Sequence, residues 1–423
     1  MRRISIFLIF VFATSINASL AQNDSLKLNL KQAEVLFLRN NFDLLSSNYQ
    51  IEQTKAEVIT AKLFDNPELQ YENLFYNHET KKILQTSYEF GQYAGSISQL
   101  IRLAGKRNKN IRLAQTGVKL AELEYFDLMR TLKFELRNTF YKTYFASQSV
   151  KVYQDQIKST EGLLKAYEIQ LKAGNIALKD VIRIKSLMIG LKAQQANLLN
   201  ELEDNYRDLR VLCGLEPNST LQLMIPSNEN KNIAIDQIPY SNLLDSARTN
   251  RTDLKLAKTG LEYNKLNLKL QKAMAIPDVE ISLAYDLKGN YPEKYTGIGL
   301  KIPIPLFNRN QGEIKKAKVG IDAATSNVKK QEIILSNEVF NSYQTAIRNE
   351  KMLTEIDPSF NKDFNKIING LIQNFRARNI SLIEFLDLYE SYKENILQIN
   401  NLQFERMSSR EELNYVTGTN IFN

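Results

Sequence analysis

The sequence contains two copies of one unit, and this duplication limits the folds that the chain can adopt. Residues 41–44 match residues 251–254 at an offset of 210. Further along, residues 175–178 (Asn-Ile-Ala-Leu) match residues 379–382 (Asn-Ile-Ser-Leu) at an offset of 204. Because each copy of an internal repeat folds as the same unit, we divide the chain at the copies. Repeat 1 is expected at residues 22–214, a linker at 215–240 and repeat 2 at 241–423.

Apolar residues recur with heptad spacing in the middle of both copies. They stand alternately three and four residues apart over residues 111–132 and over the equivalent residues 314–335, where Gln331 is the one polar member. This spacing is typical of helices that pack as coiled coils. We therefore expect an array of long helices rather than one compact globular core.

The helices should be unusually long. No strong helix breaker falls between Lys106 and Ala173, which predicts one helix about 100 Å long at about 1.5 Å per residue. The equivalent stretch of repeat 2, residues 312–377, contains Pro358, which should interrupt the helix. Helices of this length need partners alongside them.

A different periodicity, with a period of two, precedes each long helix. Apolar and polar residues alternate over residues 279–287 and again over residues 298–306. Strands of about ten residues with one apolar and one polar face are typical of membrane β-barrels. Repeat 1 shows the pattern less cleanly, with a return strand expected at residues 84–101. The two hairpins are thus predicted at about residues 67–101 and 277–306.

Four strands are too few to close a barrel, because small barrels need about eight. An open sheet edge is not tolerated in lipid. If the strands lie in a membrane, the chain must therefore oligomerise. A dimer would supply eight strands and a trimer twelve, and these patterns alone do not choose between them.

The first residues have the pattern of a secretory signal peptide. Arg2 and Arg3 precede an apolar run, and small residues follow up to Ala21. The apolar run is too short to span a bilayer as a helix. We expect residues 1–21 to be removed, which lowers the net charge from +8 to +6. This mixed, mildly basic surface does not favour nucleic acid as a partner.

The sequence lacks the residues that several kinds of binding site and active site require. With one cysteine, Cys213, and one histidine, His78, the chain cannot form a metal site of several Cys or His ligands. We expect no cofactor and no metal site. The sequence has no nucleophile elbow, phosphate-binding loop, dinucleotide fingerprint or zinc-helix motif. We therefore expect that the protein is not an enzyme, that Cys213 is a small buried residue and that His78 is an exposed loop residue.

Three sequence segments resemble those of the TolC-like outer-membrane efflux proteins, and the resemblance extends over essentially the whole mature chain. Residues 297–314 form a strand that ends in Pro-x-Pro-Leu-Phe and runs into a helix. Residues 66–69 (Asn-Pro-Glu-Leu) and 105–107 (Gly-Lys-Arg) are the other family marks. The resemblance implies a mainly α fold with a membrane β-barrel. Long coiled-coil helices would form an α-barrel through the periplasm, and a homotrimer would form a 12-stranded barrel in the outer membrane. The equatorial domain would come from residues 22–40, the linker and the C-terminal tail.

The resemblance also implies functional positions at two helical tips, near residues 172–178 and 376–382. In the family these tips contact a periplasmic adaptor (membrane fusion) protein. The matching residues of repeat 1 are Gly174, Asn175, Ile176, Ala177 and Leu178, and those of repeat 2 are Arg378, Asn379, Ile380, Ser381 and Leu382.

The segment after the second tip resembles the one that carries the family's acidic constriction. Glu384 and Asp387 are three residues apart, and therefore share one helical face. A trimer would place six such carboxylates around a periplasmic gate, where they would attract cations. In repeat 1, Asp180 aligns with Glu384, but Arg183 aligns with Asp387. Salt bridges between the unequal tips are a further expectation. The alternative is a solvated acidic helix face.

The implied function is a passive conduit in a tripartite efflux system, with an adaptor and an inner-membrane pump as partners. The segments at residues 66–69, 98–101 and 105–107 are most similar to the cobalt–zinc–cadmium (CzcC-like) branch. This points to a heavy-metal cation pump of the RND class. A multidrug or small-molecule channel is the first alternative, and a periplasmic coiled-coil scaffold is the second.

Overall fold

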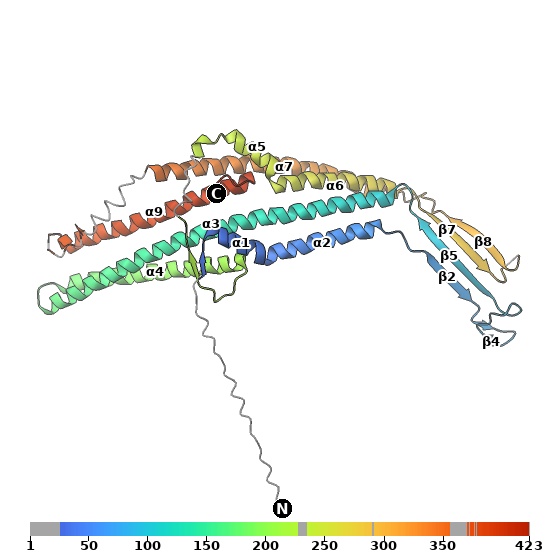
Figure 1. The fold of residues 1–423 in the computed structure, drawn as a ribbon, viewed down its shortest axis with the longest axis horizontal. Coiled ribbons are helices and arrows are strands. Elements are labelled where there is room, and N and C mark those ends of the chain that lie inside the picture. Colours follow the sequence, from blue (N-terminus) through green and yellow to red (C-terminus); the bar gives the residue numbers. More distant parts are fainter. Residues whose placement is uncertain are drawn as a thin grey trace, which may run out of the picture.

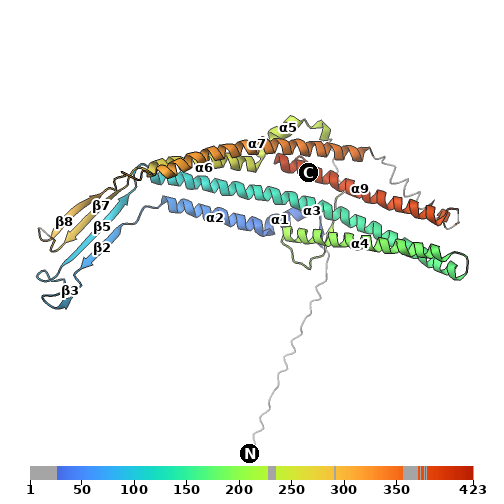
Figure 2. The same cartoon turned by 180° about the vertical axis from the view of Figure 1, so that it is seen from behind.

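The computed structural model describes residues 26–226, 235–289, 292–355 and 370–422, except residues 372, 376 and 378. The expected signal peptide, the expected helix interruption at Pro358 and the tip residue Arg378 lie outside this described part. The molecule is elongated, with long helices running side by side and a small sheet extending from one end (Figures 1 and 2).

The longest helix runs through the centre of the helical array. It is α3, which spans 67 residues, and it confirms the single helix predicted between Lys106 and Ala173. It packs against α2 and α6 towards the sheet, and against α4 and α9 in its other half. The helices are α1 (Leu30–Asn40), α2 (Phe42–Lys62), α3 (Lys106–Lys172), α4 (Leu178–Cys213), α5 (Tyr240–Asn250), α6 (Thr252–Met274), α7 (Gln311–Thr354) and α9 (Leu382–Thr417). None of the helices in the described part combines the length and the apolar character that crossing a bilayer requires.

The order of elements in the first half of the chain returns in the second half. Helices α1 and α5 have 11 residues each and begin 210 residues apart. Helices α4 and α9 have 36 residues each and begin 204 residues apart. These are the offsets at which the two halves of the sequence match.

The sheet contains four antiparallel strands in the order β2 (Glu68–Asn73), β5 (Tyr93–Ile101), β7 (Val279–Asp286) and β8 (Tyr295–Lys301). The register places apolar residues opposite one another on one face, as in the row Leu69, Ile97, Leu283 and Ile298. The next row, on the other face, contains Glu68, Ser98, Ser282 and Gly299. The sheet therefore has one apolar and one polar face, as the alternation predicted.

Two strand boundaries differ from the prediction. Strand β5 begins at Tyr93 rather than near Leu84, because Leu84 has a positive φ of 48° that ends an extended backbone. A separate small hairpin, β3 (Tyr76–Asn77) and β4 (Lys82–Ile83), precedes it. Strand β8 ends at Lys301 rather than near residue 306. Pro303 and Pro305 follow, and proline has no N–H to donate to a strand ladder.

Smaller elements lie beside the middle of the long helices, together with α1 and α5 (Figure 1). Strand β1 (Leu26–Leu28) pairs in parallel with β6 (Leu221–Leu223), and a short 3₁₀ helix spans Ile235–Gln237. Two hydrophobic clusters lie here, one around Phe37 and Phe140 and the other around Val339 and Leu413. We call this middle zone the equator.

Buried ion pairs join separate helices at the equator. Arg137 of α3 pairs with Glu34 of α1 and, at 2.7 Å, with Glu411 of α9. Glu350 of α7 pairs with Arg406 and Arg410 of α9 at 2.6 and 3.0 Å. Burial would raise the pKa of Glu350, but the two guanidinium groups outweigh it and lower that pKa. The pair of Arg137 with Glu411 joins the two halves of the chain, and the pairs of Glu350 join two helices of the second half.

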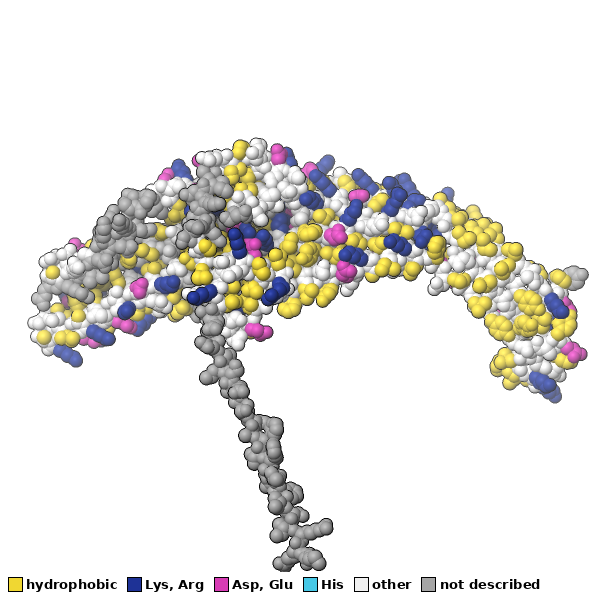
Figure 3. Space-filling view, in the orientation of Figure 1, with side chains coloured by type: hydrophobic (Ala, Val, Ile, Leu, Met, Phe, Trp, Pro, Cys, Tyr) yellow, Lys and Arg dark blue, Asp and Glu magenta, His cyan; other side chains and the backbone are white. Residues whose placement is uncertain are grey.

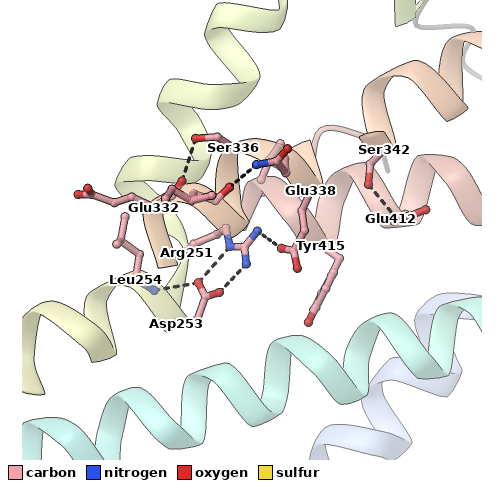
Figure 4. A network of polar contacts seen from close by, with 12 residues as sticks. Arg251, Asp253, Leu254, Glu332, Ser336, Glu338, Ser342, Glu412 and Tyr415 are labelled. Atoms are coloured by element: carbon pink, nitrogen blue, oxygen red, sulfur yellow. Dashed lines mark hydrogen bonds and ion pairs between the residues drawn. The ribbon is translucent and has the colours of Figure 1, made fainter. Parts of the chain in front are cut away.

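The start of α6 carries a further ion pair network (Figure 4). Arg251 precedes the helix and donates to Asp253 and, at 2.6 Å, to Glu338 of α7. Burial would raise the pKa of Asp253, but the hydrogen bond and charge of Arg251 lower it. The equivalent residue of the first half is Asn41, whose amide group donates to the carbonyl of Leu212 at 3.1 Å. The junction between the two helices is thus held by a neutral hydrogen bond in the first half and by ion pairs in the second half.

Candidate functional site

The first helical tip is a tight turn of five residues between α3 and α4. Gly174 has a positive φ of 74°, and its N–H donates to the carbonyl of Leu171 at 3.0 Å. The N–H of Asn175 donates to the carbonyl of Gln170 at 2.9 Å. These two bonds form the Schellman motif that ends many helices. Glycine suits the αL conformation because it has no Cβ to clash.

The second tip repeats part of this geometry. The N–H of Asn379 donates to the carbonyl of Asn374 at 2.9 Å, which is the same five-residue span as in the first tip. The following helix, α9, begins with Ser381 as its N-cap, and the Ser381 hydroxyl accepts from the N–H of Glu384 at 3.2 Å. Serine at this position satisfies a backbone donor that has no partner within the helix.

A stack of aromatic rings holds the second tip against α3. The rings of Tyr167 and Phe375 are 5.9 Å apart, and those of Phe375 and Phe385 are 4.4 Å apart. Phe385 then stacks on Tyr389, one helical turn further along α9, at 5.3 Å. Burial raises the pKa of Tyr389, so its phenol is neutral. The rings pack the start of α9 against α3.

Space remains beside this stack. A cavity of about 600 Å³ lies between α3 and the second tip, lined among others by Gly162, Gln170, Ile176 and Phe375. The rings are therefore not enclosed on every side.

The two carboxylates expected at the gate lie on the outside of α9. Glu384 and Asp387 are both exposed, whereas Phe385 between them is buried. Neither carboxylate forms an ion pair with any other residue that the structure describes. Glu384 lies in the first turn of the helix, where the dipole favours negative charge. The structure thus places them together on one surface that is open to solvent.

The equivalent surface of the first tip differs. Asp180 is half-buried at the start of α4, and Arg183 is exposed one turn later. Within one chain, no ion pair joins Arg183 to Glu384 or Asp387, all of which lie in the described part. The salt bridges expected between the unequal tips are therefore not formed inside a single subunit.

The capping role of Ser381 and the contacts of Lys393 and Tyr167 were not among the predictions made from the sequence. Ser381 and Glu384 have the Ser-x-x-Glu spacing of a helix start, which would have identified the cap. Lys393 is buried, pairs with Glu390 and donates to Gln194 of α4 at 3.2 Å. Its three-residue distance from Glu390 was the available signal. Nothing in the local pattern predicted that Tyr167 would meet Phe375.

The other residues that the sequence singled out lie away from the tips. Cys213 is buried at the end of α4, and burial raises its pKa to about 11, so it is an unreactive thiol. His78 is exposed in the small hairpin, edge-on to Tyr76. Among the described residues, no three His, Cys, Asp or Glu side chains lie close enough together to hold a metal ion.

Comparison with known proteins places this geometry in a class. Residues 33–215 match the outer membrane efflux protein family. The cobalt-zinc-cadmium resistance protein CzcC of Cupriavidus metallidurans is 22% identical over 365 residues, which are 85% of this chain and 82% of that protein.

Solved structures share the whole architecture. A membrane protein from Pseudomonas aeruginosa superposes with a TM-score of 0.74 at 14% identity, over 92% of this chain and 90% of that one. CusC superposes with a TM-score of 0.70 at 16% identity, over 92% of each chain. These likenesses concern the fold.

The family match, the relative and the shared fold agree on one class, that of outer-membrane efflux channels. By its match over residues 33–215 and by its fold, the chain is similar to the proteins of the outer membrane efflux family.

Proposed function

We propose that the chain is the outer channel subunit of a tripartite efflux system and acts there as a homotrimeric, passive conduit. The observation that carries this proposal is the sheet, which has one apolar face and two edge strands, β2 and β8. Neither edge has a further strand partner in the described part of the chain. Open edges are not tolerated in lipid, so β8 of one subunit pairs with β2 of the next, and three subunits close a 12-stranded barrel.

Purification and electrical recording test this assembly. The protein extracted from outer membranes in detergent should contain three chains per particle, by light scattering corrected for detergent. The same particle should conduct ions when added to a planar bilayer. A protein that stays monomeric and soluble without detergent would instead support the periplasmic scaffold and overturn the channel.

For the cargo we propose heavy-metal cations, delivered by an inner-membrane RND pump. The name of the CzcC relative supports this choice, and the relative aligns with 85% of this chain. A passive conduit needs no catalytic residues, and we propose that the protein is not an enzyme. The alternative is a multidrug or small-molecule channel.

The cargo can be assigned by deleting the gene and measuring growth. Deletion should lower tolerance to zinc, cobalt and cadmium at least severalfold and leave tolerance to a panel of drugs unchanged. A plasmid copy should restore growth on the metals. Loss of drug tolerance alone would assign the channel to the multidrug class.

We place the gate at the start of α9. In a trimer, Glu384 and Asp387 would supply six carboxylates around the narrow periplasmic end, with Asp180 near them. Their exposure on one helix face supports this role. Like charges brought together raise the free energy of the anionic ring, and cations in the opening relieve it. The tip would therefore favour cations over anions.

The tips would also contact the periplasmic adaptor. Leu178 and Ile383 are large apolar side chains that remain 59% and 62% exposed at the ends of the helical array. Exposed apolar residues at such a position suit a protein partner. Replacing Leu178 by Asp should abolish metal tolerance while the trimer still forms. The same change at Ile189, an exposed residue further along α4, serves as the matched control and should have little effect.

A further inference from the structure

Positive charge is concentrated where the helices adjoin the sheet. Residues 102–121 contain six Lys or Arg and no Asp or Glu. Residues 263–277 contain three Lys and no Asp or Glu. Residues 309–321 contain four Lys or Arg and one Glu. The whole chain has 55 basic and 47 acidic residues, so this imbalance is local. We call these basic residues the collar.

Most collar side chains point to solvent. Arg309, Lys315 and Lys318 are exposed, and none of them forms an ion pair with another described residue. On α6, Lys265, Lys269 and Lys272 are exposed as well. In Figure 3 dark-blue side chains gather over α6 and α7 beside the strands, whose visible side chains are mostly apolar. The collar is thus an available surface rather than a set of internal ion pairs.

Exposed aromatic and aliphatic side chains lie between the strands and the collar. Phe307, after the two prolines, is 90% exposed, and Phe64, at the end of α2, is 75% exposed. Ile304 and Leu306 are exposed on the same connection. Along the chain, apolar strands are followed by large apolar residues and then by cations. A membrane presents the same order of hydrocarbon, interface and charged headgroups.

The junction holds some of these cations in fixed positions. Arg107 lies over the ring of Phe64 at 3.9 Å, and its Nε donates to the carbonyl of Lys62 at 2.9 Å. Lys106 is buried and pairs with Asp278 at 2.7 Å. Asp278 also accepts from the N–H of Leu103 at 2.8 Å. These contacts tie the starts of α3 and β7 together and set the depth of the collar relative to the sheet.

We propose that the collar binds the headgroups of anionic phospholipids in the membrane leaflet nearest the helices. The proposal rests on the function proposed above, because it requires the sheet to lie in lipid. Headgroups extend about 5–8 Å beyond the hydrocarbon on each side, a depth reached by the first turns of α3 and α7. Each Lys or Arg near an anionic surface contributes roughly fivefold in affinity. Several cations on each of three subunits would select phosphatidylglycerol or cardiolipin over zwitterionic lipid.

The proposal can be tested on the full-length protein in detergent by native mass spectrometry. The purified trimer is delipidated and titrated separately with phosphatidylglycerol and with phosphatidylethanolamine. We expect phosphatidylglycerol to bind at least about tenfold more tightly, and added salt to reduce the preference. Equal binding of the two lipids would overturn the proposal.

Two charge-matched variants locate the site. The triple variant R309Q/K315Q/K318Q should lose most of the preference for phosphatidylglycerol. The control K151Q/K158Q/K165Q removes three exposed lysines of α3 far from the sheet and should keep it. If both variants lose the preference equally, net charge and not the collar is responsible, and the proposal fails.

The experiments distinguish failure of the lipid-binding proposal from failure of the channel proposal. A trimer that conducts ions in bilayers of phosphatidylethanolamine alone and shows no lipid preference would overturn the proposed lipid binding by the collar. The proposed channel function would then still stand. A protein that never inserts into vesicles of any composition would overturn the channel.

Discussion

The equator and the second helical tip are held together by different interactions. At the equator, Arg137 is buried between two carboxylates from different helices, and Glu350 accepts from two buried or half-buried arginines. At the tip, aromatic rings stack beside a cavity, and Glu384 and Asp387 remain exposed.

This difference indicates where the molecule can move. Separating the helices at the equator would leave buried charges without partners, which costs several kcal/mol for each pair. Moving the start of α9 uncovers mainly apolar surface, and its carboxylates are already exposed to solvent. We therefore expect the equator to stay fixed and the second tip to move when the channel opens.

The largest effect should follow from removing a buried charge at the equator. Replacing Arg137 by Ala leaves Glu34 and Glu411 facing each other without their shared cation, and should lower the free energy of unfolding by about 3–5 kcal/mol. Urea denaturation in detergent, followed by circular dichroism, measures the change. Lys142→Ala, which removes one partner of an exposed pair with Glu201, is the control and should cost less than about 1 kcal/mol. Similar losses of unfolding free energy in the two variants would contradict the idea that buried ion pairs hold the equator rigid.

Two glycines allow a closer comparison of equator and tip. Gly214 and Gly174 both have positive φ, 60° and 74°. A Cβ on Gly214 would lie 2.6 Å from the carbonyl oxygen of Asn40, whereas a Cβ on Gly174 would meet nothing within 4 Å. Gly174→Ala should therefore cost only the backbone penalty, about 1–2 kcal/mol.

Gly214→Ala should cost more than Gly174→Ala, because the backbone of α1 must also shift to accommodate the methyl group. Thermal unfolding of the two variants in parallel gives the difference directly. Equal shifts in melting temperature would show that the contact between α1 and the end of α4 is as loose as the tip.

Low pH should weaken the ion pairs of Glu350 and Asp253. The pKa values of Glu350 and Asp253 are lower in the folded protein than their ordinary values. A lowered folded pKa adds stability above the unfolded pKa, near 4, and this stability is lost as pH falls through the folded value. The free energy of unfolding should thus fall as pH drops below about 5.

The variant Glu350→Gln should flatten this acid dependence, because Gln does not titrate. Charge-assisted hydrogen bonds contribute roughly 1.5–3 kcal/mol each, so the variant should also be less stable at neutral pH. Glu201→Gln removes an exposed carboxylate and serves as the control. An unchanged acid slope in Glu350→Gln would exclude this carboxylate as a source of the pH dependence.

Local sequence patterns predicted the elements better than their contacts. The absence of breakers from Lys106 to Ala173 predicted α3, and the period of two predicted β7. The end of β8 was placed too late, because alternation continues through Pro303 and Pro305 although the ladder cannot. The stack of Tyr167 on Phe375 joins residues 208 positions apart. No local period encodes such a pair, so only the folded chain shows what supports α9.

The proposed gate predicts that the exposed carboxylates at the start of α9 set the ionic preference of the channel. This prediction can be tested by the reversal potential of single channels under a tenfold KCl gradient. The wild-type protein should show a cation-selective potential. The double variant Glu384→Ala/Asp387→Ala should shift it substantially towards zero, and Asp180→Ala should shift it less. An unchanged reversal potential in the double variant would contradict the proposed gate.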